Sequence, residues 1–440
     1  MIHNFITLVL RIFFRRLAVT GSENVPRTGP VLLVVNHPNS LVDPLLVLGL
    51  APRRVVFLAK EPLFRIPIIG TLTRAMGSIP VYRRMDGADT SQNRKTFEKV
   101  WQELARGGAI ALFPEGTSHS DPKMRPFKTG TARMALGAAS LNPGPAVQIV
   151  PGGLYYTAKV RFRSSALLCF GAPITVQSEP LGADGEPVPE SVRALTARLE
   201  DALGAVTIQA DEEEAVKLVT RAERIFSSAS GPGTRDRDLK RQFEIRQRLL
   251  RGYTQLRTQI PERIATLEGM LTRYDAELTA AGMAPENLLE SRLTIGMVVK
   301  NASIAIATLA MLAPLAIVGI AVNIVPYQLL IPLITRVVKV ERDVLATTKI
   351  FAALAAFPVV WTVFSFFVWK RWGIWIASAA WIAMPCTGFA ALRFLEGMDR
   401  LAGSALGLSL RLFRPRAFKR LELQRRKIRD ELLAMDGMIE

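Results

Sequence analysis

Cysteine and histidine are scarce in this sequence. Its 440 residues include two cysteines, Cys169 and Cys386, which lie far apart in apolar surroundings without the spacing of a metal site or a redox pair. We therefore expect two buried, inert thiols, as in proteins of a reducing compartment. The three histidines narrow the search for a catalytic base to very few positions.

Acidic residues are also under-represented, because 38 Asp and Glu stand against 56 Lys and Arg, for a formal net charge of +18. A basic excess of this size indicates an anionic partner. Nucleic acid is one candidate, but the sequence contains neither a zinc finger nor a recognisable helix-turn-helix. Anionic membrane lipids are favoured instead, because much of the basic excess lies near long uncharged segments and in the C-terminal tail.

The late part of the chain contains three runs without a charged side chain, residues 301–335, 350–369 and 374–392. Each is about as long as the apolar segment that crosses a bilayer, or longer. Tryptophans cluster at or near the ends of the last two runs, as interface aromatics do: Trp361, Trp369, Trp372 and Trp375. The sequence therefore predicts an integral membrane protein with membrane segments over residues 301–393.

Residues 1–17 form a short apolar segment that carries Arg11, Arg15 and Arg16. No small-residue cleavage site follows it, which argues against a signal peptide. The pattern favours an amphipathic helix that lies in the membrane interface. An ordinary helix packed on the protein is the alternative.

Between these ends the sequence predicts an α/β domain over residues 18–180 with a largely parallel sheet, because apolar strand-like runs alternate with helical stretches. The strand candidates are bounded by Gly, Pro and Asn: 31–37, 54–60, 77–83, 108–116, 147–156 and 166–174. Residues 191–300 read as a helical accessory region without recognisable chemistry. Residues 394–440 form a basic tail.

The most informative stretch joins His37 and Asp43 at the end of a predicted strand. Functional groups in α/β folds usually lie at such strand-to-helix turns. A carboxylate about one helical turn after a histidine can fix the imidazole tautomer, so that the other ring nitrogen removes a proton from a hydroxyl. No GxSxG nucleophile elbow is present, which favours direct attack by the acceptor hydroxyl. Taken alone, such a pair is more often structural.

Other candidate side chains follow other strands. Glu115 lies at the end of one strand, where it could hydrogen-bond an acceptor hydroxyl, and Gly116 permits a tight turn with close backbone approach. Arg83 ends another strand, and a guanidinium in that place suits bidentate phosphate binding. Lys128 is a second cation near an expected helix start.

Four blocks in this order resemble the glycerolipid acyltransferase family, which includes glycerol-3-phosphate and 1-acylglycerol-3-phosphate acyltransferases. The resemblance covers residues 15–180, and its blocks are matched by Asn36-His37 with Asp43, Gly77 with Arg83, Phe113 to Thr117, and Val150-Pro151. It implies that His37 is the general base and that Asp43 orients it. It also implies that Arg83 binds the acceptor phosphate, and it assigns Glu115, Gly116, Thr117 and Pro151 to the acceptor site.

Some positions depart from the common family pattern. Five residues separate His37 from Asp43 where four are usual, and Ser118 stands where many members have Arg. The NHPNSLVDP form is similar to a subset related to fungal glycerol-3-phosphate and dihydroxyacetone-phosphate acyltransferases. The departures leave the catalytic class intact and leave acceptor specificity open.

The expected reaction moves a fatty acyl group from acyl-CoA or acyl carrier protein to a glycerol phosphate or lysophospholipid, as in phospholipid biosynthesis. Backbone N–H groups near the third block, or Ser40, are candidates to stabilise the oxyanion. No metal and no tightly bound cofactor is needed. A catalytically inactive lipid-binding scaffold is the alternative outside the enzyme class, and a transporter is disfavoured because the apolar runs carry no charge.

The positive-inside tendency places the catalytic domain and the basic tail at the cytoplasmic face. Two ends on one side require an even number of crossings. We therefore expect residues 302–335 to enter the membrane and return near Asn323–Pro326, and residues 350–392 to form a hairpin.

Overall fold

The computed structural model describes residues 2–67, 69–141, 144–228, 239–283, 285, 288, 295–337 and 343–438. The chain divides into two compact units, each described here by itself. The first unit comprises Met1–Glu213, Leu239–Phe243 and Arg342–Thr347. The second comprises Glu214–Asp238, Glu244–Glu341 and Thr348–Glu440.

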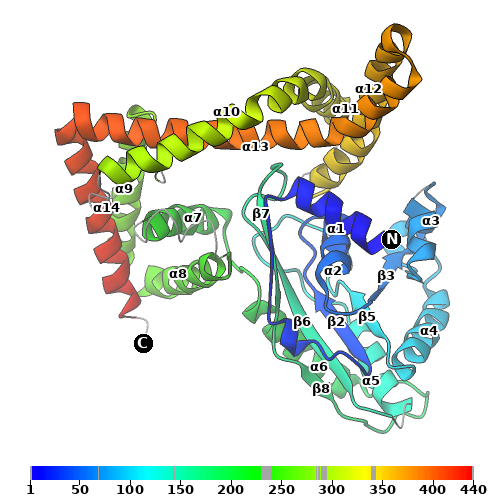
Figure 1. The fold of residues 1–440 in the computed structure, drawn as a ribbon. Helices are drawn as coiled ribbons and strands as arrows, with labels where there is room; N and C mark the ends of the chain where they lie inside the picture. Colours follow the sequence, from blue (N-terminus) through cyan, green and yellow to red (C-terminus); the bar gives the residue numbers. More distant parts are fainter. Residues whose placement is uncertain are drawn as a thin grey trace. The chain divides into compact units, whose positions relative to one another are not determined.

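The first unit contains an eight-stranded sheet in the order β1-β7-β6-β2-β5-β3-β4, with β8 paired to β6 (Figure 1). All neighbouring strands run parallel except β6 with β7 and β6 with β8. The predicted α/β class with a largely parallel sheet is therefore confirmed. The strands are β1 (Arg16–Thr20), β2 (Val31–Val35), β3 (Val56–Lys60), β4 (Ile79–Val81), β5 (Ala109–Leu112), β6 (Val147–Tyr156), β7 (Ser165–Phe170) and β8 (Ile174–Val176).

Strand β2 lies at the centre of this sheet, between β5 and β6. Its five residues Val31–Val35 are all 0% exposed. A continuous apolar run of this kind is typical of a parallel strand that is covered on both faces. Because β2 and β5 run parallel and side by side, their carboxyl ends meet at one edge of the sheet.

Helices complete the first unit: α1 (Ile2–Phe13), α2 (Val42–Leu50), α3 (Ile69–Ala75), α4 (Asn93–Ala105), α5 (Gly130–Leu141) and α6 (Pro189–Ala205), with short 3-10 turns at Ser22–Asn24, Glu61–Arg65, Arg84–Asp86 and Thr90–Gln92. Residues of α4, α5 and α6 share one apolar core with alternate residues of β2 and β5. Helix α1 packs against α2, where a Cβ at Gly49 would lie 3.0 Å from Cδ1 of Leu10.

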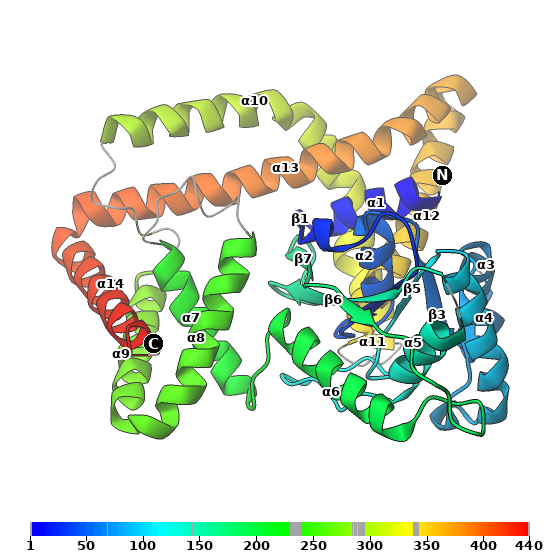
Figure 2. The ribbon, with the colours of Figure 1, turned by 90° about the horizontal axis from the view of Figure 1, so that it is seen from below.

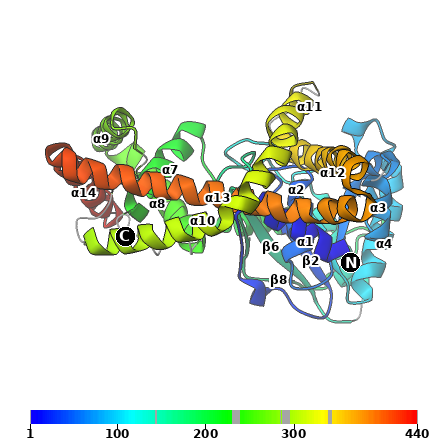
Figure 3. The ribbon, with the colours of Figure 1, turned by 45° about the horizontal axis from the view of Figure 1, so that its top comes forward.

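The second unit is helical. Its elements are α7 (Glu213–Ser228), α8 (Leu239–Gln259), α9 (Pro261–Ala280), α10 (Ile295–Val325), a π-helical turn (Pro326–Leu330), α11 (Ile331–Val337), α12 (Leu345–Trp372), α13 (Ile374–Phe413) and α14 (Pro415–Asp436), of which α7, α8 and α12 have a few residues in the first unit. Helix α10 lies beside α13 in all three views (Figure 1, Figure 2 and Figure 3). Helices α9 and α14 share an apolar core.

Among the residues that the structure describes, three helical segments are long and apolar enough to cross a membrane, namely Lys300–Val337, Leu345–Trp372 and Ile374–Phe413. Most of their surface is not covered by the protein, since between 17% and 28% of each apolar window is buried. Exposed apolar helices of this length require a lipid phase. The chain is therefore a membrane protein, as predicted.

The backbone stays helical near Asn323–Pro326, where the sequence predicted a return through the membrane, because α10 continues through the π-helical turn into α11. The Asn323 side chain there donates to the Gly319 carbonyl at 2.7 Å and accepts from Trp361 Nε1 at 2.9 Å, so it stabilises helical backbone and helix packing. The expectation of two buried cysteines needs correction, since Cys169 is half-buried and Cys386 is exposed on an apolar helix.

Candidate active site

The carboxyl ends of β2 and β5 carry the residues that the motifs singled out. Asn36 and His37 directly follow β2, and Glu115 lies three residues after the last residue of β5. The Asn36 side chain donates to the Leu154 carbonyl at 3.3 Å and accepts from the Leu154 N–H at 2.7 Å. This pair of hydrogen bonds to β6 fixes the start of the turn that presents His37.

His37 and Asp43 form the predicted pair. Nδ1 of His37 lies 2.8 Å from Oδ2 of Asp43, which stands in the first turn of α2 and is 0% exposed. An ionised carboxylate only accepts, so Nδ1 donates and Nε2 keeps its lone pair. In the described part of the chain Nε2 has no hydrogen-bond partner, and the His37 side chain is 17% exposed. The ring stacks on Phe113, with centroids 3.8 Å apart.

Two further donors hold the Asp43 carboxylate. The Asn39 N–H donates to Oδ2 at 2.6 Å, and the Tyr156 hydroxyl donates to Oδ1. Burial, followed by the nearby Asp43 charge, raises the pKa of Tyr156 well above its ordinary value, so the phenol stays a neutral donor. Asp43 is therefore fixed by donors from the turn and from the end of β6.

Ser40, a predicted oxyanion donor, lies in the same turn. Its φ of 44° is in the left-handed region that residues with a Cβ rarely adopt. Backbone strain of this kind is concentrated at functional sites. The Ser40 carbonyl accepts from the Asp43 N–H at 3.2 Å, which helps to begin α2.

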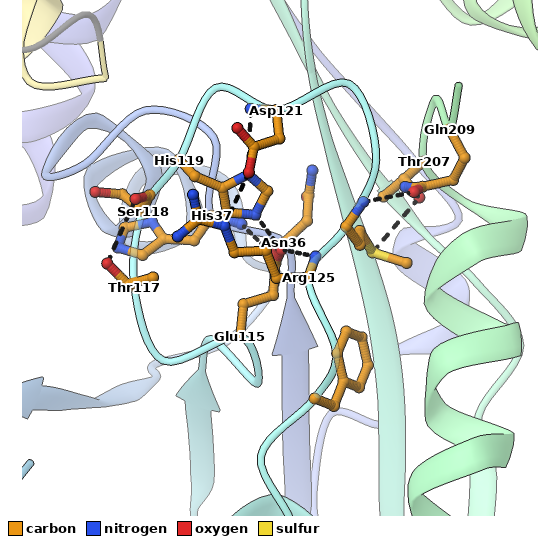
Figure 4. A network of polar contacts seen from close by, with 12 residues as sticks. Asn36, His37, Glu115, Thr117, Ser118, His119, Asp121, Arg125, Thr207 and Gln209 are labelled. Atoms are coloured by element: carbon orange, nitrogen blue, oxygen red, sulfur yellow. Dashed lines mark hydrogen bonds and ion pairs between the residues drawn. The ribbon is translucent and has the colours of Figure 1, made fainter. Parts of the chain in front are cut away.

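The Glu115 carboxylate is buried and fully engaged. It accepts from the His37 N–H at 3.1 Å through Oε1, and from the Arg125 N–H at 2.9 Å and His119 Nε2 through Oε2. Figure 4 shows His37, His119 and Arg125 around this side chain. Burial alone would raise the pKa of Glu115, but the hydrogen bonds from His119 and from the two N–H groups lower it overall. Glu115 is thus an ionised anchor for the backbone of His37.

Three other predicted residues, Arg83, Gly116 and Lys128, lie together. Arg83, directly after β4 and its flanking Tyr82, donates to the Gly116 carbonyl and makes bonds of 2.6 and 2.7 Å to Asp86. The hydrogen bond from Arg83 lowers the pKa of Asp86, which keeps this pair charged. Gly116 has φ of 74°, and a Cβ there would lie 3.6 Å from Cγ of Lys128. The two cations therefore flank one turn.

The remaining two predictions have different surroundings. Thr117 continues the Gly116 turn, and its hydroxyl lies 3.4 Å from the Ser118 carbonyl. Pro151 is buried inside β6, opposite Val34 of β2, and its carbonyl accepts from the Gly171 N–H at 2.9 Å. Its contribution to the acceptor site stays a prediction.

Four residues of this site were not singled out from the sequence, namely Tyr156, His119, Lys159 and Asp343. His119 had a signal, because it lies four residues after Glu115. Lys159 follows β6 and interacts with the charges of Asp43, Asp121, Asp343 and Glu115, yet burial lowers its pKa overall. Asp343 belongs to the segment before α12 and accepts a hydrogen bond from Ser118.

Comparison with known proteins adds to this geometry. Residues 16–154 match the acyltransferase family, and residues 223–435 match the glycerol-3-phosphate acyltransferase 2 C-terminal domain. The chain therefore carries an acyltransferase domain over residues 16–154, followed by a glycerol-3-phosphate acyltransferase 2 C-terminal domain over residues 223–435. The resemblance drawn from the four sequence blocks is confirmed, and this acyltransferase is an O-acyltransferase of glycerolipid synthesis.

Three relatives show how far the similarity of this acyltransferase extends. Glycerol-3-phosphate O-acyltransferase 1 of Saccharomyces cerevisiae is 25% identical over 97% of this chain and 69% of its own length. Glycerol-3-phosphate O-acyltransferase 2 of the same yeast is 25% identical over 65% of this chain and 52% of its own length. The 1-acyl-sn-glycerol-3-phosphate acyltransferase of Borreliella burgdorferi is 32% identical over 38% of this chain and 61% of its own length. The chain thus spans about half to two thirds of these relatives.

Proposed function

We propose that this enzyme transfers a fatty acyl group from acyl-CoA or acyl carrier protein to a hydroxyl of glycerol 3-phosphate, with His37 as the general base. The observation that carries the proposal is the His37–Asp43 pair, in which a buried carboxylate holds Nδ1 at 2.8 Å and leaves Nε2 free. A lone pair on a partly exposed imidazole nitrogen is suited to remove a proton from a bound alcohol.

The reaction proceeds by direct transfer. The acceptor oxygen attacks the thioester carbonyl carbon while Nε2 of His37 takes its proton. Backbone N–H groups of the Gly116 turn, or the Ser40 hydroxyl, stabilise the oxyanion. The carbon–sulfur bond then breaks, and His37 returns the proton to the thiolate. The products are an ester and a free thiol, and Asp43 steadies the imidazolium between the two proton transfers.

The Gly116 turn is the proposed site for the acceptor phosphate. Arg83 donates to the Gly116 carbonyl, Lys128 lies beside Gly116, and Thr117 adds a hydroxyl. A phosphate that binds here competes with Asp86 for the Arg83 guanidinium. Lys128 would supply the positive charge that Asp86 partly neutralises on Arg83. Arg84 is exposed in the adjacent 3-10 turn and is available to the same anion.

We favour glycerol 3-phosphate over 1-acylglycerol 3-phosphate as the acceptor, because residues 223–435 match a glycerol-3-phosphate acyltransferase 2 C-terminal domain. The deciding experiment uses membranes that carry the full chain, acyl-CoA as donor, and both labelled acceptors in parallel. We expect labelled product from glycerol 3-phosphate, formed about 10²–10⁴-fold more slowly with His37→Ala. Product from 1-acylglycerol 3-phosphate alone would change the acceptor. If no product formed from either acceptor, from other lysophospholipids or with an acyl carrier protein donor, the protein would instead be a lipid-binding scaffold without acyltransferase activity.

We also propose that the catalytic domain and the tail face the cytoplasm. Every candidate span in the described residues begins at or after Lys300, so no span separates the catalytic domain from α9. Helix α14 packs on α9, and Arg420 pairs with Glu277 at 2.9 Å. This packing supports a tail on the same side of the membrane as the catalytic domain, with an even number of crossings. Its many Lys and Arg side chains suit anionic lipid headgroups.

The contact of Ser118 with Asp343 supports the same side for the start of α12. The segment Lys300–Val337 then has both ends at the cytoplasmic face, and α12 with α13 forms the hairpin. A topology reporter fused after Glu440, and another inserted at Gly373 between α12 and α13, test this arrangement. We expect cytoplasmic and non-cytoplasmic signals respectively, and a non-cytoplasmic signal after Glu440 would contradict it.

Helix α1 is proposed as an additional contact with the membrane interface. Ile6, Leu10 and Phe13 are buried against the protein. Phe5, Leu8 and Ile12 are instead 44% to 56% exposed. One apolar face thus packs on the domain, and the other is available to lipid.

A further inference from the structure

Asp343 lies far from the acyltransferase motifs in sequence but within the first unit in space. It stands just before α12, between two candidate membrane segments, and is 7% exposed. The Ser118 hydroxyl donates to its Oδ2. Ala346 and Thr347, at the start of α12, are also buried, at 0% and 6% exposed. This end of the membrane helix is therefore packed into the catalytic domain.

Ser118 belongs to the turn whose residues form hydrogen bonds with the backbone of His37. The next residue, His119, donates its N–H to the His37 carbonyl at 3.1 Å and its ring nitrogen bonds to Glu115. Glu115 in turn accepts from the His37 N–H. The turn from Glu115 to His119 thus holds the backbone of His37 through both its N–H and its carbonyl (Figure 4). Asp343 bonds to this turn at Ser118.

A half-buried cation lies near the same groups. Burial lowers the pKa of Lys159, while the charges of Asp43 and Asp343 oppose that shift, and its carbonyl accepts from the Asn39 side chain at 3.2 Å. A positive charge near a buried carboxylate offsets part of the cost of its desolvation.

We propose that Asp343 is a positioning residue for acyl transfer, which fixes the turn from Glu115 to His119 through Ser118. This inference rests on the proposed function. Its consequence is that the short segment just before α12, which belongs to the first unit, contributes to the active site. The acceptor is the substrate most affected, because Gly116 and Thr117 of this turn form the proposed phosphate site.

The test compares Asp343→Ala, Asp343→Asn, Ser118→Ala and the Ser118→Ala/Asp343→Ala pair in the full chain, purified in detergent. A hydrogen bond to a charged group is worth a factor of about ten or more. We expect the KM for the acceptor to rise about tenfold in Ser118→Ala and Asp343→Ala, with an unchanged KM for acyl-CoA. The KM for the acceptor should rise less in Asp343→Asn, because the amide oxygen still accepts a hydrogen bond from Ser118. The double variant should match the single ones, since both remove one contact.

The matched control is Glu190→Gln, which removes an exposed carboxylate paired with Arg193 in the same unit. It should keep both KM values. Wild-type KM values in Asp343→Ala, or fully multiplicative losses in the double variant, would overturn the proposal. A fall in kcat alone at constant KM would do the same, because it would reflect fewer folded molecules.

A second measurement does not depend on activity. Ser118→Cys and Asp343→Cys are combined with Cys169→Ala and Cys386→Ala, so that the introduced pair holds the only thiols. Mild oxidation should form a disulfide between them, detected by mass spectrometry of linked peptides. No disulfide would overturn the contact itself. A disulfide in a protein whose wild type transfers no acyl group to any acceptor would refute the proposed function and the catalytic role while retaining the contact.

Discussion

Replacement of His37 by alanine is expected to lower kcat for acyl transfer by about 10²–10⁴-fold, the usual contribution of a general base. The residue provides the Nε2 lone pair at the open end of the site, while Nδ1 is held by Asp43 at 2.8 Å. The measurement is the rate of labelled ester formation at saturating donor and acceptor, normalised to the amount of folded enzyme.

His37→Asn separates chemistry from packing in the same assay. The asparagine amide nitrogen takes the place of Nδ1 and can still donate to Asp43, but an amide is no base at neutral pH. We therefore expect the two variants to lose activity to a similar extent. His3→Ala is the control, because His3 lies in α1, outside the site, where its ring Nδ1 is 3.0 Å from the Leu48 carbonyl of α2. Retention of more than about a tenth of the activity in His37→Ala would rule out the base, given the size of its usual effect.

The parts of the site that were predicted from sequence are those built by short segments. His37 and Asp43 are separated by six positions and are brought together by one turn and the start of one helix. Glu115 follows a buried strand, and parallel strands place their carboxyl ends at a common edge. Local pattern and sheet geometry together are sufficient for these three.

The parts that were missed depend on contacts distant in sequence. Tyr156 reaches Asp43 across 113 positions, and Ser118 reaches Asp343 across 225. A tyrosine at the end of a strand has no local signal for a buried carboxylate partner. An aspartate between two apolar segments is read as a solvated loop residue, because nothing in its neighbourhood shows that the loop returns to the catalytic domain.

The same limit applies to the second unit. The apolar runs were recognisable, but the pairing of α10 with α13 depends on small residues whose partners lie far along the chain. A Cβ at Gly319 would lie 2.0 Å from the Thr387 carbonyl, so only glycine permits this approach. Close packing at small residues is how helices associate in lipid. Periodicity within one helix cannot identify such a partner.

Asp43→Asn is expected to lower kcat on the order of 10³-fold, although it changes only one atom of the side chain. The carboxylate accepts from three donors: Nδ1 of His37, the Asn39 N–H and the Tyr156 hydroxyl. An amide has one oxygen, so at least one of these donors must face an N–H group. If the amide nitrogen faces His37, Nδ1 must accept and Nε2 carries the proton, which removes the lone pair that the reaction needs.

Tyr156→Phe is the matched variant, because it separates the loss of one hydrogen bond to Asp43 from the loss of the carboxylate charge. It removes one donor from Asp43 but leaves the charge and the bond to His37 in place. Its loss should be about tenfold or less, the size of one hydrogen bond to a charged group. The assay is kcat for both variants at saturating substrates, with thermal unfolding of each as a measure of packing. If Asp43→Asn fell no further than Tyr156→Phe, the carboxylate would only support the fold, and orientation of the base would have to come from the Glu115 turn alone.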